Sequence, residues 1–334
     1  LPLNDRKKTQ PRERLWKIRA NQVVIATGAI ERPLVFPNND RPGVMMASAI
    51  SVYLNRYGVK PGVRPVIFTN NDSAYQTVLD LTDAGITIEA VVDTRKDPQG
   101  PLPTQARQRG ITVFDGHVIV EVYGRNHVKA VALMPLDDSS KSVTGNVRKI
   151  QCDVVAVSGG WNPRVHLHCQ SGGKVEFDDI KACFIPKESI QEERSAGSCN
   201  GTFSLRNCIS EGITAGVVSS HAAGYGNGSP SLETPDTSEK SQDPLKAMWA
   251  VPSRKYAYAL RQFVDMQEDV TAYDIWLAVN EGYQSHQILH RYIQLGIGTD
   301  QGKLGNVNGM GILSDIRGVN IGSCLLYTSD AADE

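Results

Sequence analysis

The stretch that decides the fold is Val23-Val-Ile-Ala-Thr-Gly-Ala-Ile-Glu-Arg-Pro33. It opens with an apolar run typical of a buried strand and passes directly into Thr27, Gly28 and Ala29. Gly28 has no Cβ, so the main chain at this turn can approach a ligand closely. Two interpretations follow: the turn lies against a bound nucleotide, or it is an ordinary link between a strand and a loop.

Residues 65–92 have the pattern of strand, turn, helix and strand. Pro65-Val-Ile-Phe-Thr69 is a β-branched strand, residues 70–73 form a turn, residues 74–83 have helical spacing and residues 86–92 are apolar again. Together they make one βαβ unit. Residues 45–57 have helical spacing, residues 111–114, 117–123 and 128–134 alternate like antiparallel strands, and residues 153–157 form another buried strand. The sequence therefore predicts an α/β fold.

The turn of this βαβ unit lacks the usual signature of a nucleotide site. An active turn reads G-x-G-x-x-G, with the pyrophosphate at the N-terminus of the following helix. Here the sequence is Thr69-Asn-Asn-Asp-Ser-Ala-Tyr75, and Asp72 places a negative charge where phosphate oxygens would lie. Asp93, at the end of the second strand, is either a ribose contact or a solvated strand end. We expect this second site to bind NAD(P)H poorly.

Residues 23–33 resemble the point where flavoproteins with two dinucleotide-binding folds, of the glutathione-reductase type, return to their first fold. Four further motifs occur in order and are similar to the alpha subunits of heterotetrameric sarcosine oxidases. They are Asn70-Asn-Asp-Ser-Ala-Tyr75, Ser158-Gly-Gly-Trp-Asn-Pro163, Asn200-Gly-Thr-Phe203 and Gly298-Thr-Asp-Gln-Gly-Lys303. The resemblance covers most of the chain, from Leu15 to Ser323.

The resemblance implies an oxidoreductase subunit that is not catalytic alone. In that family the alpha subunit holds NAD, FMN lies at its boundary with the beta subunit, FAD lies in beta, and a small subunit carries zinc. The complex of alpha, beta, gamma and delta subunits oxidises sarcosine, reduces oxygen to peroxide and passes the one-carbon unit to tetrahydrofolate. Because the oxidation would belong to beta, we assign no catalytic residue here.

The resemblance also divides the chain into domains. Residues 1–64 and 151–225 are expected to form part of the first, NAD-binding fold, and residues 65–150 the nested second fold. Residues 226–243 are rich in Gly, Ser, Pro and acidic residues and form a linker. Residues 244–305 form a small helical domain, and residues 306–323 begin a truncated, aminomethyltransferase-like folate-binding domain. Residues 324–334 resemble sequencing-adapter read-through, so we expect a fragment with an artefactual tail.

Two segments are candidates for nucleotide contacts under this resemblance. The first consists of Ala26, Thr27, Gly28 and Ala29. In the second, small residues precede a helical run at 203–215, so free amide N–H groups and the helix dipole can face a ligand oxygen. Its candidates are Asn200, Gly201, Thr202 and Leu205. The alternative is a plain helix start with Thr202 as its cap.

A third candidate is the glycine-rich loop at residues 296–303. It is not a P-loop, because its glycine spacing is wrong and Leu304 replaces the Ser/Thr that binds magnesium. Its amides, with Thr299 and Lys303, either hold the phosphate of FMN at the boundary with beta or form a simple turn between domains.

The helical domain resembles the BFD-type domain that carries a two-iron cluster in related dehydrogenase subunits. Such clusters need thiolates, but the four corresponding positions are Asp265, Gln267, Asp300 and Gly305. We therefore expect a domain without a cluster, which favours an oxidase subunit over that of a proline, opine or other secondary-amine dehydrogenase. A third interpretation is a non-catalytic scaffold stabilised by its nucleotide.

Composition excludes several other classes. The net charge is −1 with both signs mixed, which gives no case for nucleic acid or an anionic membrane. No apolar run is long enough to span a bilayer. Six scattered cysteines without a C-x-x-C pair predict free thiols in the cytoplasm, with Cys199 as a buried one. His166-x-His168-Cys169 invites a metal, but no second pair stands at the required spacing, so we predict none.

Overall fold

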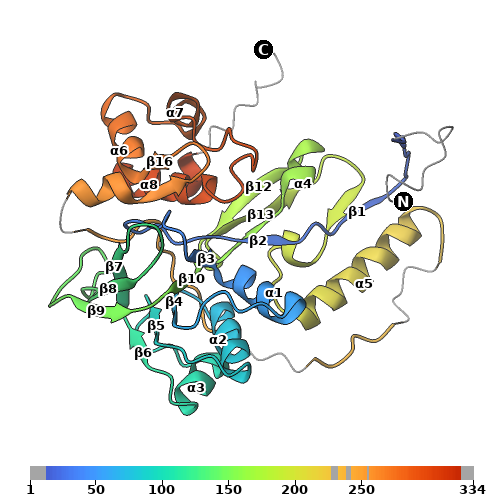
Figure 1. The fold of residues 1–334 in the computed structure, drawn as a ribbon. Coiled ribbons are helices and arrows are strands. Elements are labelled where there is room, and N and C mark those ends of the chain that lie inside the picture. Colours follow the sequence, from blue (N-terminus) through green and yellow to red (C-terminus); the bar gives the residue numbers. More distant parts are fainter. Residues whose placement is uncertain (1–12, 227–231, 238–241, 254–255, 325–334) are drawn as a thin grey trace, which may run out of the picture.

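The computed structural model describes residues 13–226, 232–237, 242–253 and 256–324 (Figure 1). Of the predicted artefact, residues 325–334 lie outside the described residues, whereas Cys324 is buried in a hydrophobic core. Parts of the predicted linker, residues 227–231 and 238–241, also lie outside them. No described helix combines the length and the apolar character that crossing a membrane would require.

The largest sheet has five parallel strands in the order β3-β10-β4-β5-β6. These are β3 (Val44–Met46), β10 (Val154–Ser158), β4 (Pro65–Thr69), β5 (Ala90–Asp93) and β6 (Val113–Asp115). Helices α1 (Ala47–Tyr57) and α2 (Ser73–Asp83) pack beside it, and α3 (Pro101–Gln108) follows β5. The three central strands are buried throughout, as expected for parallel strands covered on both faces.

This sheet corrects two sequence expectations. Both β3 and β10 lie outside residues 65–150, the predicted second fold, and were expected in the first fold. In the structure, however, β10 lies between β3 and β4, so both strands belong to the sheet of the second fold. Strands far apart in sequence pair here because apolar runs need cover on both faces, which local pattern does not reveal. Likewise, the predicted strand at 111–114 is β6, which pairs in parallel with β5 and not with an antiparallel neighbour.

The excursion between β6 and β10 forms a three-stranded antiparallel sheet, as predicted for residues 117–134. It contains β7 (His117–Tyr123), β8 (Ala130–Pro135) and β9 (Arg148–Gln151) in that order. Its inner face shares one hydrophobic core with β4, β5 and β10.

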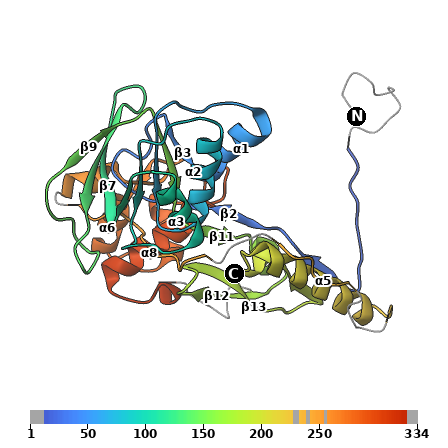
Figure 2. The same ribbon diagram turned by 90° about the horizontal axis from the view of Figure 1, so that it is seen from below.

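The other strands assigned to the first fold form three small sheets. β1 (Val23–Ile25) pairs in parallel with β14 (Glu193–Ser195), and β2 (Ala29–Glu31) pairs with β11 (Trp161–Pro163). β12 (Lys174–Asp178) and β13 (Cys183–Glu188) form a hairpin. The short α4 (His166–Gln170) follows β11, and the long α5 (Leu205–Ala222) lies beside β1, as Figure 2 shows from below.

The helical domain begins with the hairpin β15 (Phe263–Asp265) and β16 (Val270–Thr271), followed by α6 (Ala272–Asn280) and α7 (His286–Ile293). A capping box between Thr271 and Asp274 fixes the start of α6. α8 (Asn306–Arg317) packs against α6, and Leu313 shares a core with Ile275 and Leu289. Residues 306–324 therefore complete the helical domain and do not begin a separate one, because their apolar side chains are buried within it.

Candidate dinucleotide site

The turn after β1 is held in place by the loop that follows β11. Thr27 Oγ1 donates to the carbonyl of Arg164 at 2.8 Å, and the Arg164 amide donates to the carbonyl of Gly28 at 2.9 Å. Gly28 has a φ of +78°, which L-residues rarely adopt. A residue with a Cβ would be strained at this turn, so the backbone conformation here requires glycine.

The structure brings the two predicted nucleotide segments together. Because β1 and β14 are parallel, Ile25 pairs with Ser195 and both strands end at the same edge. A 3₁₀ turn, Gly197–Asn200, follows β14, and a Cβ added at Gly28 would lie 3.8 Å from Ser198 Oγ. Carboxyl ends of parallel strands are where α/β folds bind nucleotides.

The candidates of the second segment are arranged around Glu211 on α5. Asn200 Nδ2 donates to one carboxylate oxygen of Glu211 and the Gly197 amide donates to the other. Gly201 is buried with a φ of +76°, and a Cβ there would lie 2.6 Å from Ile185 Cγ2. The side chains of Asn200 and Glu211 therefore hold the turn onto the helix.

The start of α5 differs from the prediction. The helix begins at Leu205, whose side chain is exposed, and its N-cap is Ser204, whose hydroxyl accepts from the Asn207 amide. Thr202 is consequently not the cap. It lies in the turn before the helix, where its amide donates to the carbonyl of Gly197.

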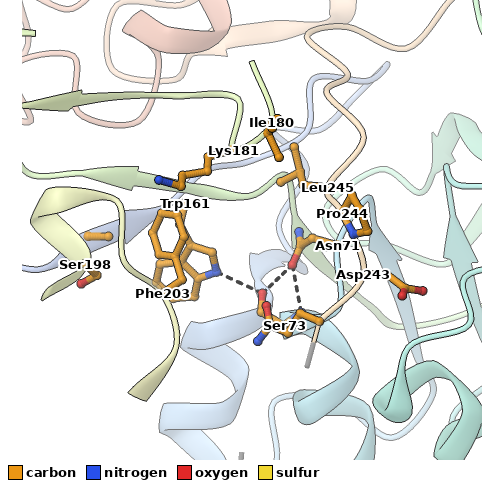
Figure 3. A pocket seen from close by; sticks show the side chains of 12 residues that line it. Asn71, Ser73, Trp161, Ile180, Lys181, Ser198, Phe203, Asp243, Pro244 and Leu245 are labelled. Atoms are coloured by element: carbon orange, nitrogen blue, oxygen red, sulfur yellow. Dashed lines mark hydrogen bonds between the residues drawn. The ribbon is translucent and has the colours of Figure 1, made fainter. Parts of the chain in front are cut away.

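A cavity of about 400 Å³ opens where the two segments meet the second fold (Figure 3). Its size lies within the range of small-molecule sites. The lining residues come from both predicted segments, from the turn after β4 and the start of α2, from β11, from the turn between β12 and β13, and from residues 242–245. They are Ala29, Asn71, Ser73, Trp161, Ile180, Lys181, Ser198, Phe203, Gln242, Asp243, Pro244 and Leu245. Of the predicted site residues, only Ala29 lines it directly.

The second fold has a buried cluster of charged side chains where a dinucleotide would bind. Arg95 lies 2.8 Å from a carboxylate oxygen of Asp72 and 2.8 Å from one of Asp93, and the Tyr75 hydroxyl donates to Asp93 at 2.9 Å. Burial disfavours the charge of Arg95, but Asp93 and Asp72 outweigh it and raise its pKa. Burial also raises the pKa of Asp72, although the charge of Arg95 partly opposes this rise.

Both sequence interpretations of Asp93 are thereby corrected. It is fully buried, so it is not a solvated strand end, and its oxygens are occupied by Arg95 and Tyr75, so it is not a free ribose ligand. The sequence could not show that a guanidinium two residues further on folds back onto the strand end.

Thr299 and Lys303 lie in the loop between α7 and α8, and neither is among the described residues that line the cavity. The Thr299 hydroxyl donates to Gln267 Oε1 at 2.9 Å, and Lys303 Nζ donates to the carbonyl of Asp300 at 3.1 Å. The amides of Gly302 and Leu304 donate to the Asp300 carboxylate. The groups expected to hold the FMN phosphate are thus engaged by other groups of the helical domain.

The four positions that correspond to cluster ligands lie in the same part of the helical domain. Gln267 Oε1 accepts from the Asp300 amide at 3.2 Å, and Asp265 Oδ2 accepts from the Gly296 amide at 2.8 Å. Polar side chains therefore join the turn between β15 and β16 to the loop between α7 and α8. Within the described ranges, no group of three or more His, Cys, Asp or Glu side chains could hold a metal ion.

His166 and His168 lie on the short helix α4. His168 is buried, with Nδ1 2.7 Å from Glu193 Oε1 and Nε2 2.9 Å from the carbonyl of Lys174. Both ring nitrogens of His168 are therefore engaged by oxygen atoms of the chain. All six cysteines lie in the part of the chain that the structure describes and all are free, and Cys199 is buried as predicted.

Sequence reasoning missed most of the cavity walls. Trp161 stood in a quoted motif, but no signal marked its ring as a lining group, and Phe203 was counted only as part of the helix. Asp243 was placed in the linker, where its acidic character resembles that of any solvated segment.

The comparisons with known proteins agree with this architecture. Residues 259–329 match the family model of the sarcosine oxidase A3 domain. The chain is 36% identical over 311 residues to sarcosine oxidase subunit alpha of Corynebacterium sp. (strain P-1), covering 92% of this chain and 32% of that protein. It is 37% identical over 310 residues to the subunit alpha of Rhizobium meliloti (strain 1021), covering 93% of this chain and 30% of that protein.

Among solved structures, L-proline dehydrogenase from P. horikoshii has a TM-score of 0.66 at 20% identity, over 92% of this chain and 55% of that one. This likeness shows that the chain has a mixed α/β fold. The relatives are subunits of an oxidoreductase, and the chain belongs to the family of sarcosine oxidase alpha subunits. It spans about a third of the length of the curated relatives that it matches.

Proposed function

We propose that this chain is the nucleotide-holding segment of a sarcosine oxidase alpha subunit and that it binds NAD where residues 26–29 meet residues 198–203. One observation carries the proposal. Two segments about 170 residues apart in sequence end side by side on parallel strands, next to a cavity of about 400 Å³. Dinucleotides bind at such edges, where amide groups and positive dipoles face the phosphates.

The residues present fit a dinucleotide at this edge. The positive φ of Gly28 presents main chain without a Cβ, and Ser198 is near enough to Gly28 for one ligand to contact both. In this proposal the chain binds and orients the nucleotide, and contributes no acid or base.

We further propose the activity of the complete protein from the names of its relatives, which are sarcosine oxidase subunits. With beta, gamma and delta subunits in the cytoplasm, the protein would convert sarcosine to glycine, reduce oxygen to hydrogen peroxide and transfer the one-carbon unit to tetrahydrofolate. FMN at the boundary with beta and FAD in beta would supply the electron transfer.

The assignment of the FMN phosphate to Thr299 and Lys303 stays a prediction, and the bonds of the loop speak against it. The Asp300 carboxylate already accepts from two of the amides that a phosphate would need. A carboxylate in that place would also repel a phosphate.

The NAD site is tested by placing a larger side chain in the cavity. Ser198 lines the cavity, so Ser198→Leu in the complete subunit, purified with its partners, is expected to lose most of its NAD because the side chain takes the ligand's space. The matched control is Ser220→Leu on the exposed side of α5. NAD released by heat is measured by enzymatic cycling. Asn200 is less suited to the test because its side chain bonds Glu211.

Two outcomes would contradict the proposal. A wild-type complex without any dinucleotide would refute NAD binding, and full NAD content in Ser198→Leu would refute its location. Turnover with proline or an opine, but not with sarcosine, would assign the complex to another secondary amine.

A further inference from the structure

The cavity has a wall that the sequence did not predict. Residues 242–245, here called the strap, end the linker and cross the face where the second fold meets the predicted nucleotide segments (Figure 3). The strap lies opposite Trp161 and Phe203 in this view, with the cavity between them.

Asp243 anchors the strap to the second fold. One oxygen of its carboxylate accepts from the amides of Gln99 and Gly100, each at 2.6 Å, at the N-terminus of α3. Its own amide donates to Asp72 Oδ2 at 2.8 Å. Hydrogen bonds to a charged group are among the strongest in proteins, so this residue is the main attachment of the strap.

Two further contacts fix the strap's direction. Asn70 Nδ2 donates to the carbonyl of Lys246 at 2.8 Å, and the Lys246 amide donates back to the carbonyl of Asn70 at 3.2 Å. Leu245 packs on Gly160, where a Cβ would lie only 2.5 Å from Leu245 Cδ1. The chain can cross at this point because Gly160 has no side chain.

The opposite wall offers aromatic faces in a fixed orientation. Trp161 Nε1 donates to Ser73 Oγ at 3.0 Å, which holds the indole ring in place. Phe203 lines the same cavity, and both side chains are half-buried. Aromatic side chains of this kind favour planar, polarisable ligands.

We propose that the cavity receives one planar ring of the dinucleotide, between Trp161 and the strap, and that Asp243 retains the ring by anchoring the strap. This inference rests on the proposed NAD site, because Ala29 and Ser198 belong both to that site and to the cavity wall. Nicotinamide and adenine share the chemistry needed, a flat ring with hydrogen-bonding groups.

The test is the rate at which NAD leaves the complete complex. Labelled NAD is loaded and chased with unlabelled NAD for the wild type, for Asp243→Ala and for Asp236→Ala. Asp236 is the matched control, because it lies in the same linker but pairs with Arg206 on the surface. Loss of two charge-assisted bonds is expected to accelerate release by about ten- to a hundredfold in Asp243→Ala only.

Equal release rates in Asp243→Ala and wild type would overturn the role of the strap and leave the NAD site intact. A wild type without NAD would end both proposals. A second measurement is independent of the Asp243 variant. Nicotinamide mononucleotide and AMP are titrated separately into the complex stripped of NAD, and the fluorescence of Trp161 is followed as the difference between the wild type and Trp161→Phe. Quenching by one of them identifies the ring, and quenching by neither overturns the cavity assignment.

Discussion

Replacing Arg95 by methionine tests whether the second fold is held together by its own ions. The guanidinium of Arg95 lies between Asp72 and Asp93, and all three residues are buried. Methionine keeps much of the side-chain volume but leaves two buried carboxylates without a counter-charge. Breaking a buried ion pair in this way costs about 3–5 kcal/mol.

The loss should be local to the parallel sheet. We expect the amides of β4 and β5 to exchange with solvent about a hundredfold faster or more, while those of α6 in the helical domain keep their protection. Hydrogen exchange followed by mass spectrometry separates the two regions, which a single melting curve of a multidomain chain does not.

The matched variant removes all the charges at once. In Asp72→Asn/Asp93→Asn/Arg95→Met no charge is left in this cluster. Most of the protection from exchange that β4 and β5 lose in Arg95→Met should therefore return. A single Arg95→Met variant with unchanged exchange at β4 and β5 would refute the reasoning, and so would a triple variant that is less protected than the single one.

Three further predictions concern other parts of the chain. Burial, followed by the charge of His290, lowers the pKa of His286 from 6.5 to about 4. The unfolded state therefore binds more protons between pH 6.5 and 4, so the helical domain should lose up to about 3 kcal/mol of stability as the pH falls through this window, and His286→Leu should abolish that loss in thermal unfolding at pH 7 and 4.5. Gly201→Ala should cost about 1–3 kcal/mol and lower NAD content, whereas Gly212→Ala, in an open part of α5, should stabilise by about 0.5–1 kcal/mol in the same urea titration. Gln267→Ala removes the acceptor of Thr299 and should speed proteolysis of the loop at residues 296–304, with unchanged cleavage contradicting the role of that bond.

Local pattern was sufficient for the elements whose burial is decided by their own sequence. β4, β10, α1 and α2 have apolar runs or helical spacing, and the structure has them within a few residues of the prediction. The order β3-β10-β4 could not be predicted, because any of several apolar strands could occupy the place beside β4. α8 was assigned to another domain because its buried face is completed by elements from earlier in the chain, among them α6 and β15, which its own sequence does not reveal.

The candidate site shows the same division. Gly28 and the residues around Asn200 could be proposed because small residues at strand ends and helix starts have a recognisable function there. Asp243 and Arg95 carry ordinary charges in the sequence, and their importance comes from partners 2 to 171 positions away. Burial of a charge is a property of the folded chain, which is why the notion of a solvated Asp93 was wrong.

These contacts explain how a nucleotide fold persists without the glycines that a phosphate needs. Arg95 and Tyr75 occupy the carboxylate of Asp93, which a ribose hydroxyl would otherwise contact, and the carboxylate of Asp243 accepts from the amides at the start of α3. These polar groups have partners from the chain itself, so the second fold does not depend on a ligand to satisfy them. Its strand edge and the strap instead form a wall for the neighbouring cavity. The same argument predicts that restoring glycines at residues 70–74 would not restore NAD(P)H binding while Arg95 and Asp243 remain. Tight NADPH binding to such a variant, measured by calorimetry on the complete subunit, would show that the internal partners do not block the site.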